Sequence, residues 1–245
     1  RRGAALFDTG FHYVGALDEG ESLHTLFSYF DLMGLPWKKL DEDCFDEVVI
    51  GEDTFAFANK HQRFYERMAA RFPKEREGLK KYVDFLKGVG DHIFDAFKGD
   101  ESKRHTYTLL SRSAYEFLNE TIQNPLLRKV LSGTSLKMEL NAPTLPLYTF
   151  AQINDSFIRS AWRLRGGGSQ IADKLVEGIL SMGGEVRTRA AVTYIKEENG
   201  KAVGVIVNEE DYLEADWIIS SVHPSHTISL VKDSKALRKI YRNRI

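Results

Sequence analysis

The sequence has 245 residues, of which 42% are hydrophobic and 28% charged, and its 34 Lys and Arg against 35 Asp and Glu give a formal charge of −1. This balance is typical of a soluble globular protein and argues against a general nucleic-acid binder, which needs a net basic surface. The single cysteine, Cys44, excludes a disulfide scaffold and a cysteine-rich zinc site. The sequence contains no run of about 18 apolar residues, so it predicts no transmembrane helix.

The N-terminal segment predicts a strand, a turn and a helix. Residues 4–7 are apolar and lead into the polar turn Asp8-Thr9-Gly10. Residues 22–33 then carry leucines and phenylalanines at helical spacing, and Ser22 is a residue type that caps helices.

The middle of the chain predicts one hairpin and then several helices. Two apolar segments flank a turn at Gly51, as in a β-hairpin. Residues 61–72 and 73–97 predict two helices, the second with a continuous apolar face. Ser113 and Glu116 form a capping box for a further helix.

The last third returns to strands. A glycine run, Gly166-Gly167-Gly168, opens a helix, and residues 186–188 predict a strand. Residues 192–207 predict a hairpin that turns at Asn199-Gly200, and the apolar run 217–222 predicts a buried central strand. The chain is therefore expected to be of the α/β class (α+β), with a sheet interrupted by a long helical insert.

Asp8-Thr9-Gly10 is the first candidate site and has three interpretations. An aspartic-protease motif would need a second copy, which a symmetric dimer would have to supply, in a fold that is nearly all β. An Asx turn at a strand end needs no function. A strand end beside a cofactor would use Gly10 to let another group approach the backbone closely.

The glycine run Gly166-Gly167-Gly168 is the second candidate site and has two interpretations. Its backbone N–H groups could face an anion or a flat ring, or the glycines could simply form a flexible helix entry. It fits neither the P-loop nor the G-x-G-x-x-G pattern. The histidines are scattered and predict no metal site, and no catalytic residue can be assigned from the pattern.

Several segments together carry a family resemblance. They are Phe7 to Tyr13, Gly166 to Leu175, Gly184 to Ile195, Gly204-Val205 and Ala215 to Ser221, in this order along the chain. They resemble segments of the phytoene-desaturase-like flavoproteins, a group of the FAD amine-oxidase superfamily that includes carotenoid desaturases, carotenoid isomerases and retinol saturases. The form of the first segment is most similar to the retinol-saturase and carotenoid-isomerase branch.

The resemblance implies FAD as cofactor and leaves NAD(P) open as a second one. It also implies a partial FAD/NAD(P)-binding mixed sheet and a largely helical substrate-binding domain. The residues that it implies at the cofactor are Asp8, Thr9, Gly10, Phe11, His12, Gly166, Gly167, Gly168, Val192 and Ser221. The aromatic residues that could line an apolar substrate channel, with plain core packing as the alternative, are Tyr148, Phe150, Phe157 and Trp162.

The domain boundaries expected from the resemblance divide the chain into four parts. Residues 1–18 and 166–230 are expected to form a partial FAD-binding domain, residues 19–165 the substrate-binding domain, and residues 231–245 the start of a further helical segment. The family's G-x-G-x-x-G unit and its final glycine-rich segment have no counterpart here. We therefore expect an interior piece of a longer protein that binds FAD weakly or not at all by itself.

The expected function is that of an FAD-dependent oxidoreductase, acting on an apolar, carotenoid-like or retinoid-like substrate by hydride transfer with the flavin. Amine or porphyrinogen oxidation is the alternative enzyme, and a non-catalytic module that binds an apolar ligand or a protein is the alternative class. The expected partner is a small apolar substrate rather than nucleic acid. A cytoplasmic location is expected, peripheral membrane contact stays open, and the sequence does not predict the oligomeric state.

Overall fold

The structure is a computed structural model that describes residues 10–93, 100–138, 144–231, 234 and 236–244. It divides into two compact units, which we call unit 1 (residues 1–178) and unit 2 (residues 179–245). Two of the residues expected at the cofactor, Asp8 and Thr9, lie outside the described residues.

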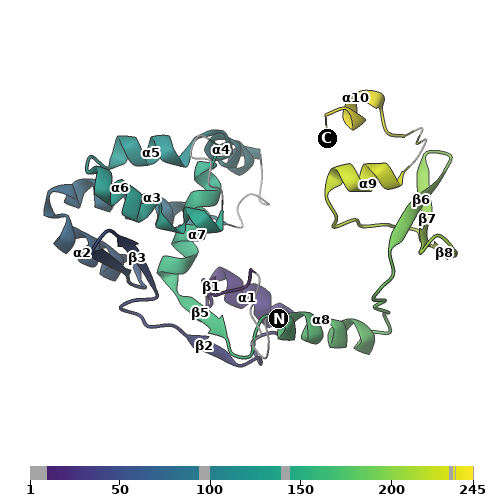
Figure 1. Cartoon of the computed structure of the whole chain (residues 1–245), viewed down its shortest axis with the longest axis horizontal. Helices are drawn as coiled ribbons and strands as arrows, with labels where there is room; N and C mark the ends of the chain where they lie inside the picture. The colour runs from purple at the N-terminus through teal and green to yellow at the C-terminus, as the bar shows by residue number, and fades with distance from the viewer. Residues whose placement is uncertain (1–9, 94–99, 139–143, 232–233, 235, 245) are drawn as a thin grey trace. The chain divides into compact units, whose positions relative to one another are not determined.

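Unit 1 contains the helical part of the chain (Figure 1). Its strands are β1 (Val14–Gly15), β2 (Trp37–Lys39), β3 (Asp46–Ile50), β4 (Asp53–Phe57) and β5 (Ala161–Leu164). Its helices are α1 (Ser22–Tyr29), α2 (His61–Arg71), the 3₁₀ helix η1 (Pro73–Glu75), α3 (Arg76–Asp91), α4 (Asp100–Ser111), α5 (Ala114–Thr121), α6 (Pro125–Leu131), the 3₁₀ helix η3 (Gly133–Lys137), α7 (Leu147–Arg159) and α8 (Ser169–Ser181), whose last residues belong to unit 2.

Two small antiparallel sheets flank these helices. One has the strand order β1-β5-β2, with Val14 opposite Trp162 and Lys39 opposite the same tryptophan on the other side. The other is the β3–β4 hairpin, whose turn contains Gly51 at φ +64°. The hairpin predicted around Gly51 is therefore confirmed.

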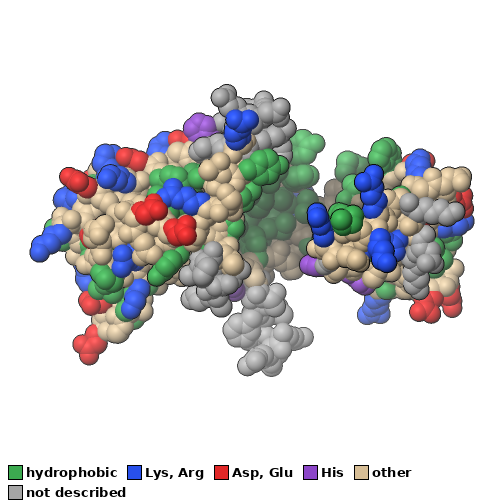
Figure 2. All heavy atoms as spheres, turned by 90° about the horizontal axis from the view of Figure 1, so that it is seen from above, with side chains coloured by type: hydrophobic (Ala, Val, Ile, Leu, Met, Phe, Trp, Pro, Cys, Tyr) green, Lys and Arg blue, Asp and Glu red, His purple; other side chains and the backbone are tan. Residues whose placement is uncertain are grey.

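The core of unit 1 forms around α3. Its residues Leu79, Tyr82 and Leu86 are at most 1% exposed, and α7 packs against the same helix. The buried positions of α3 recur at helical spacing, so the apolar face predicted there is confirmed as a core face. Around it, Figure 2 shows acidic, basic and hydrophobic side chains interspersed on the visible surface of unit 1.

The sequence predicts N-caps at Ser113 and Ser22, and the structure has the first but not the second. The Ser113 Oγ accepts hydrogen bonds from the amides of Tyr115 and Glu116 at 3.1 and 3.4 Å, which confirms it as an N-cap. The cap predicted at Ser22 was wrong, because Glu21 occupies the N-cap position and Ser22 is the first helical residue.

Unit 2 is a three-stranded antiparallel sheet with two short helices. Its elements are β6 (Val192–Glu198), β7 (Lys201–Val207), β8 (Asp211–Glu214), α9 (Pro224–Leu230) and α10 (Lys239–Arg242). Asn199 and Gly200 connect β6 to β7 with φ angles of +52° and +80°, which confirms the predicted hairpin turn.

Two strands predicted in unit 2 are absent from the described part of the chain. Residues 186–188 and 217–222 are not strands. The second run was expected to be buried, yet Trp217 is 89% and Ile219 is 96% exposed. A strand needs a neighbour to receive its backbone hydrogen bonds, and no described strand pairs with either run.

The helices and small sheets place the chain in the α/β class (α+β), as the sequence predicts. Within the described residues, no helix combines the length and the apolar character needed to span a bilayer.

Candidate functional site

Phe11, the residue that follows the first candidate motif, lies against the glycine run of the second motif in unit 1. A Cβ atom added to Gly168 would lie 3.0 Å from Cδ1 of Phe11, which is closer than a β-carbon ordinarily comes to a neighbour. The Phe11 ring therefore occupies the space that the missing side chain leaves. The structure brings together two segments that the family resemblance places at one cofactor.

The glycine run forms a defined turn before α8. Gly166 and Gly167 have φ angles of +88° and +100°, which are favourable only for glycine. The side-chain amide of Gln170 donates to the carbonyl oxygens of Arg165 and Gly167 at 2.7 and 2.9 Å. The turn is thus fixed by hydrogen bonds from the first turn of the helix that follows it.

Phe11 packs beside Trp37, a residue of strand β2. The rings of Phe11 and Trp37 have centroids 6.3 Å apart, and Phe27 lies 5.5 Å from the same tryptophan. The Trp37 indole N–H donates to the carbonyl oxygen of Leu32 at 2.9 Å, which orients the ring. Phe11 therefore forms one packed group with residues of α1 and β2.

Gly10 and His12, on either side of Phe11, are exposed. Among the described residues, no atom beyond its chain neighbours lies within 4 Å of the position that a Cβ atom of Gly10 would occupy. A flat group such as the flavin ring can approach the backbone there, so this end of the segment fits a bound cofactor. Gly168 does not offer the same room, because Phe11 covers it.

A polar cluster that the sequence did not predict follows the motif. The Tyr13 hydroxyl donates to Oδ2 of Asp46 at 2.5 Å, and Lys137 Nζ lies 2.9 Å from the same oxygen and also bonds to the Tyr13 hydroxyl. The ammonium also sits 3.9 Å from the centre of the Tyr13 ring. Tyr13 precedes β1, Asp46 lies in β3 and Lys137 in η3, so no local pattern could have joined them.

The contacts within this cluster change the pKa values of Tyr13 and Asp46. Burial raises the pKa of the Tyr13 hydroxyl, and its bond to the Asp46 carboxylate raises it further. Burial also acts to raise the pKa of Asp46, but hydrogen bonds from Tyr13 and Lys137 outweigh it and hold that pKa below its usual value. Tyr13 therefore keeps its proton while Asp46 is ionised.

The four aromatic residues considered for a substrate channel occupy different environments. Phe157 packs on Tyr13 with centroids 4.7 Å apart, whereas Phe150 is fully buried beside Tyr82 in the core. Trp162 donates to Oδ1 of Asp18 at 2.9 Å, and Tyr148 is partly buried against the core. Their role as a substrate lining stays a prediction.

The remaining predicted cofactor residues belong to unit 2. Val192 begins β6 and is 37% exposed, and Ser221 is exposed in the segment before α9. In the part of the chain that the structure describes, no group of three or more His, Cys, Asp or Glu side chains is arranged to hold a metal ion.

The whole chain also resembles a solved structure in its fold. A crystal structure of an oxidoreductase from Methanosarcina mazei superposes with a TM-score of 0.60 at 18% identity, covering 96% of this chain and 53% of that one. This likeness shows the fold. A family model described as flavin containing amine oxidoreductase matches residues 1–242, and the chain therefore belongs to this flavoprotein family.

The chain is also similar to curated proteins of the branch that the sequence motifs resemble. The all-trans-retinol 13,14-reductase of Danio rerio is 28% identical over 265 residues, which cover 96% of this chain and 43% of the relative. The human protein of the same name is 26% identical over 226 residues (83% and 37%), and the chloroplastic prolycopene isomerase of Daucus carota is 24% identical over 210 residues (74% and 34%). The chain thus spans less than half the length of these relatives.

Proposed function

We propose that this chain forms part of an FAD-dependent oxidoreductase whose substrate is an apolar polyene of the retinoid or carotenoid type. Family membership supports the flavin and the oxidoreductase class. The names of two relatives supply the substrate class, since one is a reductase of all-trans-retinol and the other an isomerase of prolycopene. Both of these molecules carry a long conjugated polyene chain.

The contact between Phe11 and Gly168 carries the proposal. It joins the segment before β1 to the glycine turn before α8, as a common cofactor edge would require. Beside this contact, Gly10 leaves its side-chain position empty.

Bound FAD would supply the exchange of a hydride with the substrate. The chain's own residues would then bind the flavin and orient it. Gly10 would admit the flat ring to the backbone, Phe11 would hold the segment in place through Gly168, and the turn at Gly166 and Gly167 would fix the start of α8. No described residue is assigned as the acid or base of the reaction.

We further propose that the chain by itself binds FAD weakly and is inactive. The sequence contains no G-x-G-x-x-G unit, whose backbone N–H groups and helix N-terminus would hold the pyrophosphate. Titration of the purified chain with FAD, followed by flavin fluorescence, tests this. Retention of FAD at near-unit stoichiometry after gel filtration would contradict it, and the same titration with NADPH tests a second cofactor.

The substrate class is tested on the product of the complete open reading frame that encodes this chain. We expect it to retain FAD and to reduce or isomerise all-trans-retinol or prolycopene, detected by chromatography of the products. Substitution Gly10→Val should lower flavin retention, whereas Gly34→Val, which also meets no neighbouring atom and needs no positive φ, should not. Turnover of amines without any change in the polyenes would refute the substrate class.

A further inference from the structure

Unit 2 contains a cavity of about 430 Å³ between its sheet and the C-terminal segment. Ile195 of β6 and Ala202 of β7 form one wall, and Ile218, Ile228 and Leu237 contribute to the others. This volume lies within the range of about 300–1,000 Å³ that is typical of small-molecule sites, and an apolar lining with a few polar groups is their usual composition.

The cavity uses one face of the segment that also contains a predicted cofactor residue. Along the extended run before α9, Ile218, Ser220 and Val222 face the cavity, whereas the alternate residues Trp217 and Ile219 are 89% and 96% exposed. Side chains alternate between the two faces of an extended segment. Ser221, the predicted cofactor residue, therefore belongs to the face that the cavity does not use.

The polar groups of the lining determine which ligand fits. Ser220 and Thr227 face each other with their hydroxyl oxygens 2.7 Å apart, and each oxygen has a second lone pair that can accept a hydrogen bond. Among the described residues that line the cavity, Glu197 is the one charged side chain, and it accepts a hydrogen bond from Ser234. The hydroxyl pair can both accept and donate a hydrogen bond, which suits a hydroxyl group on the ligand, and the Glu197 carboxylate disfavours an anion.

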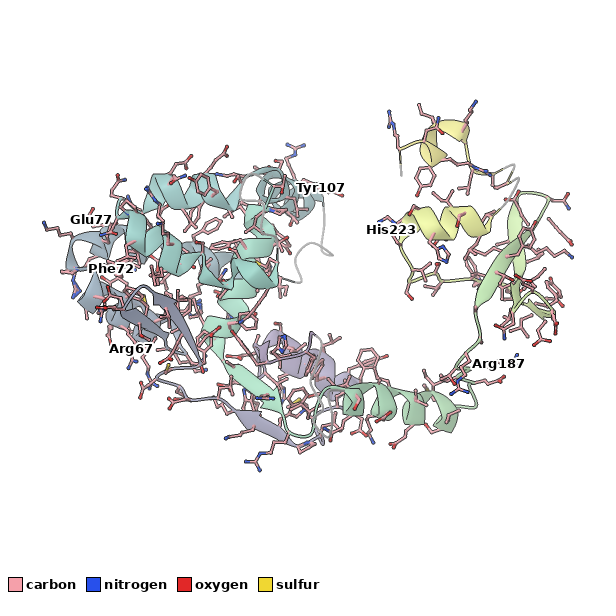
Figure 3. All side chains as sticks on the ribbon, in the orientation of Figure 1. Arg67, Phe72, Glu77, Tyr107, Arg187 and His223 are labelled. Atoms are coloured by element: carbon pink, nitrogen blue, oxygen red, sulfur yellow. The ribbon has the colours of Figure 1, made fainter. Side chains whose placement is uncertain are left out.

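We propose that this cavity binds a small apolar molecule that carries a hydroxyl group. The apolar body packs between the sheet and α9, and the hydroxyl donates to the Ser220–Thr227 pair. Figure 3 labels His223 at the start of α9, the helix that presents Thr227 and Ile228 to the cavity. The proposal does not depend on flavin binding or on the substrate of the enzyme.

Displacement of the neutral dye Nile red from the purified chain tests the proposal, with 1-decanol and sodium decanoate as competitors. We expect saturable dye binding, and displacement by decanol at a concentration at least tenfold lower than that required for decanoate. Arg242 makes this comparison informative, because its guanidinium donates to the carbonyl oxygen of Ser234 at 3.1 Å. If that group turned inward to bind a headgroup, decanoate would compete as well as decanol, and the proposal would be overturned.

Two adjacent isoleucines supply the matched variants. Ile218→Ser places a polar group in the cavity wall and should weaken dye binding at least tenfold, whereas Ile219→Ser changes the exposed face and should leave it unchanged. Equal effects of the two substitutions would show that the dye binds an exposed surface and would overturn the proposal.

A further variant tests the cavity while its fold is checked independently. Ala202→Phe fills the cavity from the sheet side and should abolish saturable binding while the circular dichroism spectrum stays that of the parent chain. If a folded Ala202→Phe variant binds the dye as the parent does, the site lies elsewhere. Gly10→Val should change FAD binding without changing dye binding, so the two proposals can fail separately.

Discussion

A Cβ atom on Gly90 of α3 would lie 1.7 Å from Oδ2 of Asp155 on α7. The absence of a side chain at this position lets the two helices enclose the carboxylate, whose side chain is 3% exposed. His61 Nε2 lies 2.6 Å from one carboxylate oxygen and Arg159 Nε 2.5 Å from the other, so the buried charge is paired on both sides. This network joins α2, α3 and α7 and supports the helical part of unit 1.

Substitution Gly90→Ala should destabilise the chain. The added methyl group collides with the buried carboxylate, and overpacking of this kind costs about 1–3 kcal/mol. Urea unfolding measures the change. The control is Gly88→Ala in the same helix, where no atom lies within 4 Å and removal of the glycine should stabilise the helix by about 0.5–1 kcal/mol. Equal effects of the two substitutions would contradict the packing described here.

Substitution Asp155→Asn should be among the most damaging single changes in unit 1. It leaves the partly buried Arg159 without one of its two carboxylate partners, and removal of one partner from a buried pair costs about 3–5 kcal/mol. Asp84→Asn is the matched control, because its pair with Lys80 is exposed and should contribute no more than about 0.5 kcal/mol. A loss of similar size in both variants by urea unfolding would refute the role of the buried carboxylate.

The Tyr13–Asp46–Lys137 cluster should make stability depend on acid pH. The pKa of Asp46 is lowered in the folded chain, so its contribution is complete above the usual carboxyl range of about 4 and is lost as pH falls through the lowered value. Substitution Lys137→Met removes one of the groups that lower this pKa. The stability difference between parent and variant should therefore be present at pH 7 and shrink as the pH falls below the usual carboxyl range.

The measurement is urea unfolding of both chains between pH 7 and pH 3. Lys80→Met serves as the control, because Lys80 and its partner Asp84 are largely exposed and their pair should contribute little at either pH. A difference between parent and Lys137→Met that stays constant with pH would show that Lys137 acts through packing on Tyr13 rather than through the charge of Asp46.

The glycine turn before α8 should tolerate no side chain. Gly166 has a φ of +88°, and Gly166→Ala should cost about 1–2 kcal/mol because an L-residue is strained there. Gly178→Ala within α8 meets no atom within 4 Å and should be neutral or stabilising by up to about 1 kcal/mol. Thermal unfolding of the two variants provides the comparison, and a neutral Gly166→Ala would contradict the fixed turn.

Part of the fold could be predicted because its signals are local. Asn199-Gly200 imposes the hairpin turn of unit 2 through its positive φ angles, and Ser113 caps its helix through bonds to the next residues. The buried face of α3 follows from its helical spacing of apolar residues. The ordered motifs also indicated the flavoprotein family, which the match over residues 1–242 confirms.

The predictions that failed depended on neighbours that a sequence pattern does not specify. Residues 217–222 have the composition of a central strand, but strand formation requires a pairing partner, and the described part of the chain provides none. The N-cap position predicted at Ser22 is occupied by Glu21, whose side chain makes no cap hydrogen bond. It accepts a hydrogen bond from the amide of Asp18 and another from the Ser160 hydroxyl. The hydrogen bond from Ser160 and the pairing of strands both involve residues that are distant in the sequence.

The sequence by itself determined the turns, the cap at Ser113, the amphipathic face of α3 and the family, because backbone preference, periodicity and motif order are written within short segments. Only the tertiary structure decided that Phe11 covers Gly168, that Gly90 encloses Asp155, and that Tyr13 meets Asp46 and Lys137. Each of these contacts joins residues distant in the chain. The path of the folded backbone sets which of them meet, and no local propensity encodes that path.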